Sequence, residues 1–147
     1  MSEPMLKIFW EPATLHFQRL EWKIGYTDQV ADETYLGLST TDFRANPNRR
    51  YSATRFDEIN TKQVRTYLQY TLEPTDEILL MVTGYFNKFS RDWFKLHELR
   101  GPTVALAVAL EDPDSLAILR GESPGTFRVR HNRRIYEAYG IQSVLNW

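Results

Sequence analysis

Cysteine is absent from the 147 residues of this chain, and several classes of protein are excluded at once. A disulfide scaffold, a Cys-ligated metal site and a thiol nucleophile all require that side chain. Charge of one sign is also lacking, because 18 Lys and Arg residues oppose 19 Asp and Glu residues. The resulting net charge of −1 gives no overall field that would draw the chain onto nucleic acid or a membrane.

Long hydrophobic runs and export signals are missing as well. The longest apolar run, residues 104–110, is far shorter than the ~20 residues that a membrane-spanning helix needs. The N-terminal segment MSEPMLKIFW has no basic stretch followed by an uninterrupted apolar core, which a secretory signal requires. We therefore expect a cytoplasmic protein with no membrane partner.

The composition is that of an ordinary globular domain with many aromatic residues. Apolar residues make up 42% of the chain and charged residues 25%, and the length suits a single globular domain over residues 1–147. The aromatic content of 14% is enough for a large buried core, and it also fits an interface rich in rings. Both interpretations of the rings stay open from sequence alone.

The first third of the sequence has the alternation of strands. Apolar side chains occupy every second position over residues 6–10 and 20–26, the pattern of half-buried antiparallel strands. Residues 35–38 suggest a third strand. Residues 40–57 show no period and contain an Asn-Pro-Asn turn at 46–48, so we expect a long polar loop there.

From residue 60 onward, segments with apolar residues at helical spacing alternate with short continuous apolar runs. Residues 60–72 and 86–99 carry apolar stripes at helical spacing, whereas residues 77–83 form a continuous apolar run typical of a buried strand. In an alternative interpretation, residues 76–100 form one helix with Gly84 inside it. We then expect a strand at 103–110, a helix at 112–120 capped by Asp112, a strand at 127–131, a helix at 132–139 and a strand at 141–147.

These elements predict an α/β or α+β fold with a mixed sheet in a single domain. A β-rich N-terminal third precedes a β-α-β-α-β-α-β C-terminal half. Strand–helix–strand units imply parallel pairing with right-handed crossovers.

The segment FRVRHNRR, residues 127–134, is a candidate anion-binding site. Arg128 and Arg130 share one face of the expected strand, and Arg133 and Arg134 fall in the first turn of the expected helix. Free N–H groups at a helix N-terminus, surrounded by arginines, favour a phosphate or a carboxylate. The alternative is that carboxylates of the chain itself pair with these arginines.

A second basic cluster lies in the expected loop and mixes arginines with rings. Its members are Arg44, Arg49, Arg50, Tyr51, Arg55 and Phe56. Guanidinium groups beside aromatic rings suit an acidic protein surface, and they also suit single-stranded nucleic acid, where charge follows the backbone and rings stack on bases. A solvated loop with local ion pairs is the alternative.

Catalytic candidates are sparse. His131 lies among arginines with Glu137 nearby in sequence, an arrangement that could move protons during phosphodiester cleavage. The expected carboxyl ends of parallel strands would place Thr83 and Glu111 at a common polar cleft. The three histidines have no metal-ligand spacing, and neither a nucleophile elbow nor a glycine-rich phosphate loop occurs, so we expect no metal and no cofactor.

The sequence therefore favours a small non-catalytic binding or assembly protein that recognises an acidic partner surface or an anionic ligand. A nucleic-acid-binding domain and a small phosphoester-processing enzyme are the alternatives. The sequence fixes neither the partner nor the oligomeric state.

Overall fold

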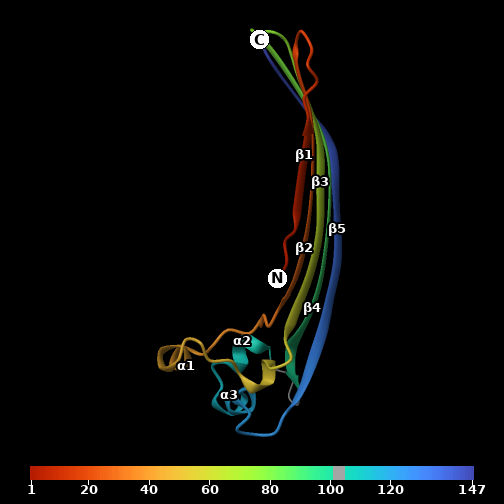
Figure 1. Ribbon diagram of the computed structural model, residues 1–147. Helices are drawn as coiled ribbons and strands as arrows, with labels where there is room; N and C mark the ends of the chain where they lie inside the picture. Colours follow the sequence, from red (N-terminus) through yellow and green to blue (C-terminus); the bar gives the residue numbers. More distant parts are fainter. Residues whose placement is uncertain (101–104) are drawn as a thin grey trace. The chain divides into compact units, whose positions relative to one another are not determined.

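The computed structural model describes residues 1–100 and 105–147, and most of them form one antiparallel sheet. Its five strands lie in the order β1-β2-β3-β4-β5, so neighbours in the sheet are neighbours along the chain (Figure 1). Their bounds are Met5–Trp10, Phe17–Ala31, Glu58–Thr75, Ile78–Arg100 and Thr126–Asn146. The short helices α1 (Thr40–Ala45) and η1 (Ser52–Thr54) separate β2 from β3, and α2 (Leu106–Ala109) and α3 (Pro113–Arg120) separate β4 from β5.

The predicted β-α-β-α-β-α-β half is wrong, and so is the mixed, partly parallel sheet. The helices expected at 60–72, 86–99 and 132–139 all lie within strands. These segments are rich in Thr, Val, Ile, Tyr and Phe, which favour strands because their bulky side chains fit a pleated surface. The two-residue connection at 76–77 joins β3 to β4 as a hairpin, whereas parallel pairing would need a crossover.

Other local predictions agree with the structure. The strands expected at 6–10 and 20–26 are confirmed within β1 and β2. The helix expected at 112–120 is confirmed as α3, where the Asp112 side chain caps the first turn by accepting from Ser115 N at 2.9 Å. The strand expected at 103–110 is wrong where it can be compared, since its Ala- and Leu-rich segment forms α2, and residues 103 and 104 lie outside the described residues.

The chain divides into two compact units, and β2 to β5 contribute residues to both. Unit 1 comprises Met1–Gln29, Thr61–Arg91 and Arg134–Trp147, and unit 2 comprises Val30–Asn60 and Asp92–Arg133. That the chain is a single domain stays a prediction.

Unit 2 has a hydrophobic core that strand and helix residues build together. Leu96 of β4 is fully buried in it, as is Leu119 of α3. The remaining members are Leu36, Tyr51, Leu106 and Ala109. Gly125 lies against this helical layer, and a Cβ there would collide with Ile118 Cγ2, so a larger residue requires Ile118 to shift. Unit 2 therefore covers its part of the sheet with its own helices.

A buried carboxylate stabilises the loops of unit 2. Asp42 accepts a hydrogen bond from the Tyr51 hydroxyl at 2.7 Å and two from the Arg120 guanidinium at 2.8 and 3.0 Å. These donors, Tyr51 first, outweigh the opposing effect of burial and hold the pKa of Asp42 below its usual value. Segments distant in the sequence are thus joined at one charged group.

Candidate functional site

In unit 1, one face of the sheet carries most of the polar side chains, and several of them bond to one another. The Glu21 carboxylate on β2 accepts from the Tyr67 hydroxyl on β3 at 2.7 Å and pairs with Lys7 Nζ on β1 at 2.9 Å. These groups, Tyr67 first, hold the pKa of Glu21 below its usual value. On the same face, Gln63 Nε2 of β3 donates to Asn87 Oδ1 of β4 at 2.8 Å. This face therefore combines bonded polar groups with exposed apolar side chains such as Met5 and Phe9, which are 60% and 55% exposed.

The opposite face of unit 1, here called the apolar face, is richer in large apolar side chains. Leu6 pairs with Ile24 and Ile8 with Trp22 in the register of β1 on β2. Trp22 Nε1 donates to Thr66 Oγ1 at 2.9 Å and so extends the face onto β3. Since side chains alternate along a strand, every second residue continues this face. Its large apolar side chains include Leu6, Ile8, Trp10, Leu20, Trp22, Ile24, Val64, Leu68, Leu72, Val82, Phe86, Ile135, Tyr139 and Ile141.

The apolar face is open to solvent. Leu68 is 49% exposed, Tyr139 78% and Ile141 80%. Single exposed apolar residues are normal on proteins, whereas large contiguous apolar patches are rare on monomeric soluble proteins.

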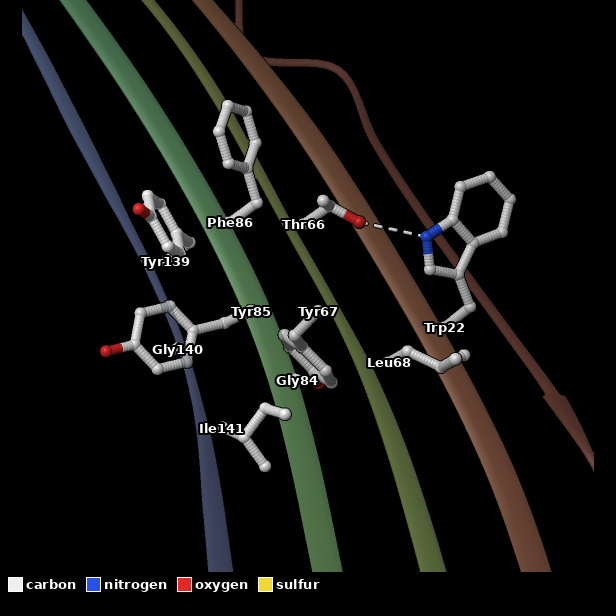
Figure 2. Close-up of a pocket in the computed structure, with 10 residues that line it drawn as sticks. All are labelled: Trp22, Thr66, Tyr67, Leu68, Gly84, Tyr85, Phe86, Tyr139, Gly140 and Ile141. Atoms are coloured by element: carbon white, nitrogen blue, oxygen red, sulfur yellow. Dashed lines mark hydrogen bonds between the residues drawn. The ribbon is translucent and has the colours of Figure 1, made fainter.

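A hollow of about 640 Å³ lies in the middle of this face, over Gly84 of β4. Figure 2 shows Gly84 surrounded by Trp22 of β2, Leu68 of β3 and Ile141 of β5, with the rings of Phe86 and Tyr139 completing the rim. Among the described residues, nothing lies within 4 Å of the position that a Cβ on Gly84 would take. The absence of a side chain at this one position therefore creates the hollow.

Charge on the apolar face is balanced within the face. Lys88 Nζ of β4 pairs with Glu137 Oε1 of β5 at 2.7 Å, and Lys62 Nζ of β3 lies 4.0 Å from Asp28 Oδ2 of β2. Over the described strands of unit 1, alternation places no other charged side chain on this face. The surface is therefore neutral and apolar.

The predicted anion-site residues are placed along β5. Residues 126–146 form one strand, so the helix N-terminus on which that prediction depended is absent. Arg128 Nη1 lies 3.2 Å from Glu98 Oε1, and Arg133 Nε donates to Asp92 Oδ2 at 2.8 Å. The two arginines thus bind different carboxylates of unit 2.

The other two members of this set differ from each other. Arg130 makes no ion pair with any described residue, and Arg134, which belongs to unit 1, donates to the Tyr136 hydroxyl at 3.4 Å. The anion site stays a prediction, and its helical component is removed.

Half of the predicted partner-binding cluster is used inside unit 2. Arg49 pairs with Asp42 at 3.0 Å, and the buried Tyr51 donates to the same carboxylate. Arg50 Nη2 donates to the carbonyl oxygens of Thr54 and Asp57, each at 2.6 Å. These three residues hold the loop together.

The rest of the cluster has no such internal role. The Arg55 guanidinium lies over the Phe56 ring, 4.6 Å from its centroid, and Phe56 is 67% exposed. Arg44 makes no ion pair within the described ranges. Arg44, Arg55 and Phe56 are therefore the members that a partner could contact.

The two catalytic candidates, His131 and Glu137, each contact a different charged residue. His131 Nδ1 lies 3.2 Å from Asp92 Oδ1, and its ring meets the edge of Phe94 at 4.8 Å between centroids. Burial opposes ionisation of Asp92, but hydrogen bonds from His131 and Arg133 outweigh it and lower the pKa of this carboxyl. The predicted partner Glu137 instead pairs with Lys88 in unit 1.

The strand ends expected to form a cleft from Thr83 and Glu111 do not exist. Thr83 lies within β4 and belongs to unit 1, whereas Glu111 follows α2 in unit 2. Thr83 Oγ1 accepts from Gln69 Nε2 at 3.0 Å. The prediction failed because it assumed parallel strands, whose carboxyl ends share one edge of a sheet.

Neither a protein-family model nor a curated protein nor a solved structure matches the chain. In the described part of the chain, no helix has the length and apolar character to cross a membrane. No set of three or more His, Asp or Glu among the described residues is placed to hold a metal ion.

Proposed function

We propose that this chain is a non-catalytic assembly protein that binds an apolar, uncharged protein surface through the apolar face of unit 1. One observation carries the proposal: large apolar side chains are exposed together on one side of the sheet, whereas the other side carries most of the bonded polar groups. An antiparallel sheet of this kind has one face in water and one face covered. Rings such as Trp22 and Tyr139 are also the residue types that contribute most to protein interfaces.

The proposal is tested by measuring dye binding and mass together on the full chain. If another protein molecule covers the apolar face, the mass measured by sedimentation exceeds that of a monomer. If the face is open, the chain binds an apolar fluorescent dye. Ile141→Lys, on the apolar face, is expected to reduce whichever signal is present. Gln142→Lys is the matched control, because it adds the same charge one residue along β5, on the opposite face. A monomer that binds no dye would contradict the proposal.

Recognition of an acidic partner is the second candidate function, with Arg44, Arg55 and Phe56 in contact. It is supported by the exposed Phe56 and by the absence of an ion pair at Arg44 within the described ranges. We expect Arg44→Gln combined with Arg55→Gln to weaken binding of an acidic peptide. For a single-stranded oligonucleotide, the affinity would instead fall steeply with salt, since phosphate contacts release counterions. Binding of neither probe would remove this candidate.

A further inference from the structure

We infer that the surface covering the apolar face is the same face of a second copy of this chain, so that two unit 1 sheets pack face to face about a two-fold axis. This inference rests on the proposed function, because it names the partner of the same face. Three properties of the face support it: its area, its charge and its relief.

The area matches what a stable dimer needs. Strands β2 to β5 run together through unit 1 for roughly 12 residues, or about 40 Å at ~3.3 Å per residue. Four strands spaced ~4.8 Å apart, with the shorter β1 beside them, give a face of about 850 Å². A specific interface buries about 800 Å² on each partner. One further copy of the same face is therefore sufficient cover.

The charge of the face is compatible with self-association. Its charged side chains form two pairs within the described strands, Lys88 with Glu137 and Lys62 with Asp28. A second copy therefore brings no excess of like charge, which would repel it. A neutral face also offers no means of selecting a basic or an acidic foreign partner.

The shape of the apolar face is also compatible with a two-fold interface, because the face has both a hollow and projecting side chains. In such an interface the same patch meets itself, so any hollow must be filled by a projection on that same patch. The hollow over Gly84 lies beside Tyr139 and Ile141, which are the most exposed of its neighbours. Trp22 Nε1 already donates to Thr66, so burial of this ring leaves its N–H satisfied.

The test is sedimentation of the full chain over a dilution series. We expect a dimer for the unmodified chain. Ile141→Lys should raise the dissociation constant by at least about tenfold, because each dimer then buries two added charges. Gln142→Lys should leave the dissociation constant unchanged.

A second variant fills the hollow without adding charge. Gly84→Leu has open space at its Cβ and no positive φ, so the monomer is expected to accept it, while the partner loses the hollow. The dissociation constant should again rise by at least about tenfold. Circular dichroism checks that each variant is folded. If Ile141→Lys does not fold, the dissociation constant of Gly84→Leu alone tests the inference.

The outcomes separate the inference from the proposed function. A dimer weakened by these variants supports both. A monomer that binds apolar dye overturns self-association and leaves the proposed function standing, with a foreign protein as the occupant. If that monomer instead binds neutral phosphatidylcholine vesicles through the same residues, the occupant is a lipid surface and both fail. A monomer that binds no dye also contradicts both, and a dimer unaffected by either face variant overturns the inference.

Discussion

Units 1 and 2 share four strands but differ in how deeply their apolar side chains are buried. In unit 2, Leu96 of β4 is fully buried beneath residues of α2 and α3. In unit 1, Phe86 of the same strand is 37% exposed, and no helix of the described chain belongs to this unit. Within the described residues, unit 2 thus has helices of its own and unit 1 has none. This difference between the units is the basis of the proposal that another molecule covers the apolar face.

The largest expected effect tests this difference with one substitution made in each unit. Leu96→Ala should lower the free energy of unfolding by about 2–5 kcal/mol, because it removes a buried side chain and leaves a cavity. Leu68→Ala should cost less than about 1 kcal/mol in the monomer, since Leu68 is half exposed. Denaturant unfolding at high dilution measures both. If both substitutions lowered the free energy of unfolding equally, the apolar face would be covered within the monomer. The difference between the two units would then not exist.

The second prediction concerns the buried polar group of unit 2. Tyr51→Phe should cost about 1.5–3 kcal/mol of unfolding free energy, because the charged Asp42 loses one donor without access to water. The folded-state pKa of Asp42 is lowered, so its stabilising contribution is full above the unfolded-state value of about 3.9 and is lost as the pH falls through the folded-state pKa. The cost of Tyr51→Phe should therefore shrink in acid. Unfolding measured at neutral pH and near pH 3 checks this, and a pH-independent cost would contradict it.

The third prediction compares two glycines. Gly125→Ala in unit 2 should cost about 1–3 kcal/mol, because the new Cβ meets the branched Ile118 side chain and neither can move freely. Gly84→Ala in unit 1 should instead stabilise the monomer by about 0.5–1 kcal/mol, since glycine weakens a strand and open space surrounds its Cβ position. Thermal unfolding of both variants gives the signs. A destabilising Gly84→Ala would mean that the hollow is filled in the monomer.

The same contrast explains which parts of the fold could be predicted from the sequence. Over residues 19–24 charged and apolar side chains alternate strictly, and this pattern predicts the strand. In β3, both faces carry large side chains, and Val64, Tyr67, Leu68 and Thr71 therefore fit a helical period as well as a strand. The strands are also unusually long, since β4 has 23 residues where 3–10 are typical. Shorter elements of alternating type were therefore expected in their place.

The candidate site was missed for a related reason. Gly84 was interpreted as the point where a strand ends, whereas it lies inside β4 and creates the hollow. Tyr139 and Ile141 were divided between a helix and a strand, so they were not expected to share a surface with Trp22. A period-two reading of residues 135–141 would have placed them together. Knowing that unit 1 has no helix among the described residues requires the tertiary structure, because sequence periodicity does not show what packs above a strand.

The smallest expected effects concern the arginines of β5. Arg133→Gln should lower the free energy of unfolding by no more than about 1 kcal/mol, because its pair with Asp92 is exposed to water. We also expect inorganic phosphate to leave the unfolding midpoint of the chain unchanged. Glu98 and Asp92 already occupy Arg128 and Arg133, so a phosphate would have to displace carboxylates held on the same sheet. If phosphate raised the midpoint and Arg130→Gln removed the gain, an anion would bind folded unit 2. Unit 2 would then be open to a ligand as well, and the distinction between a closed and an open unit would no longer hold.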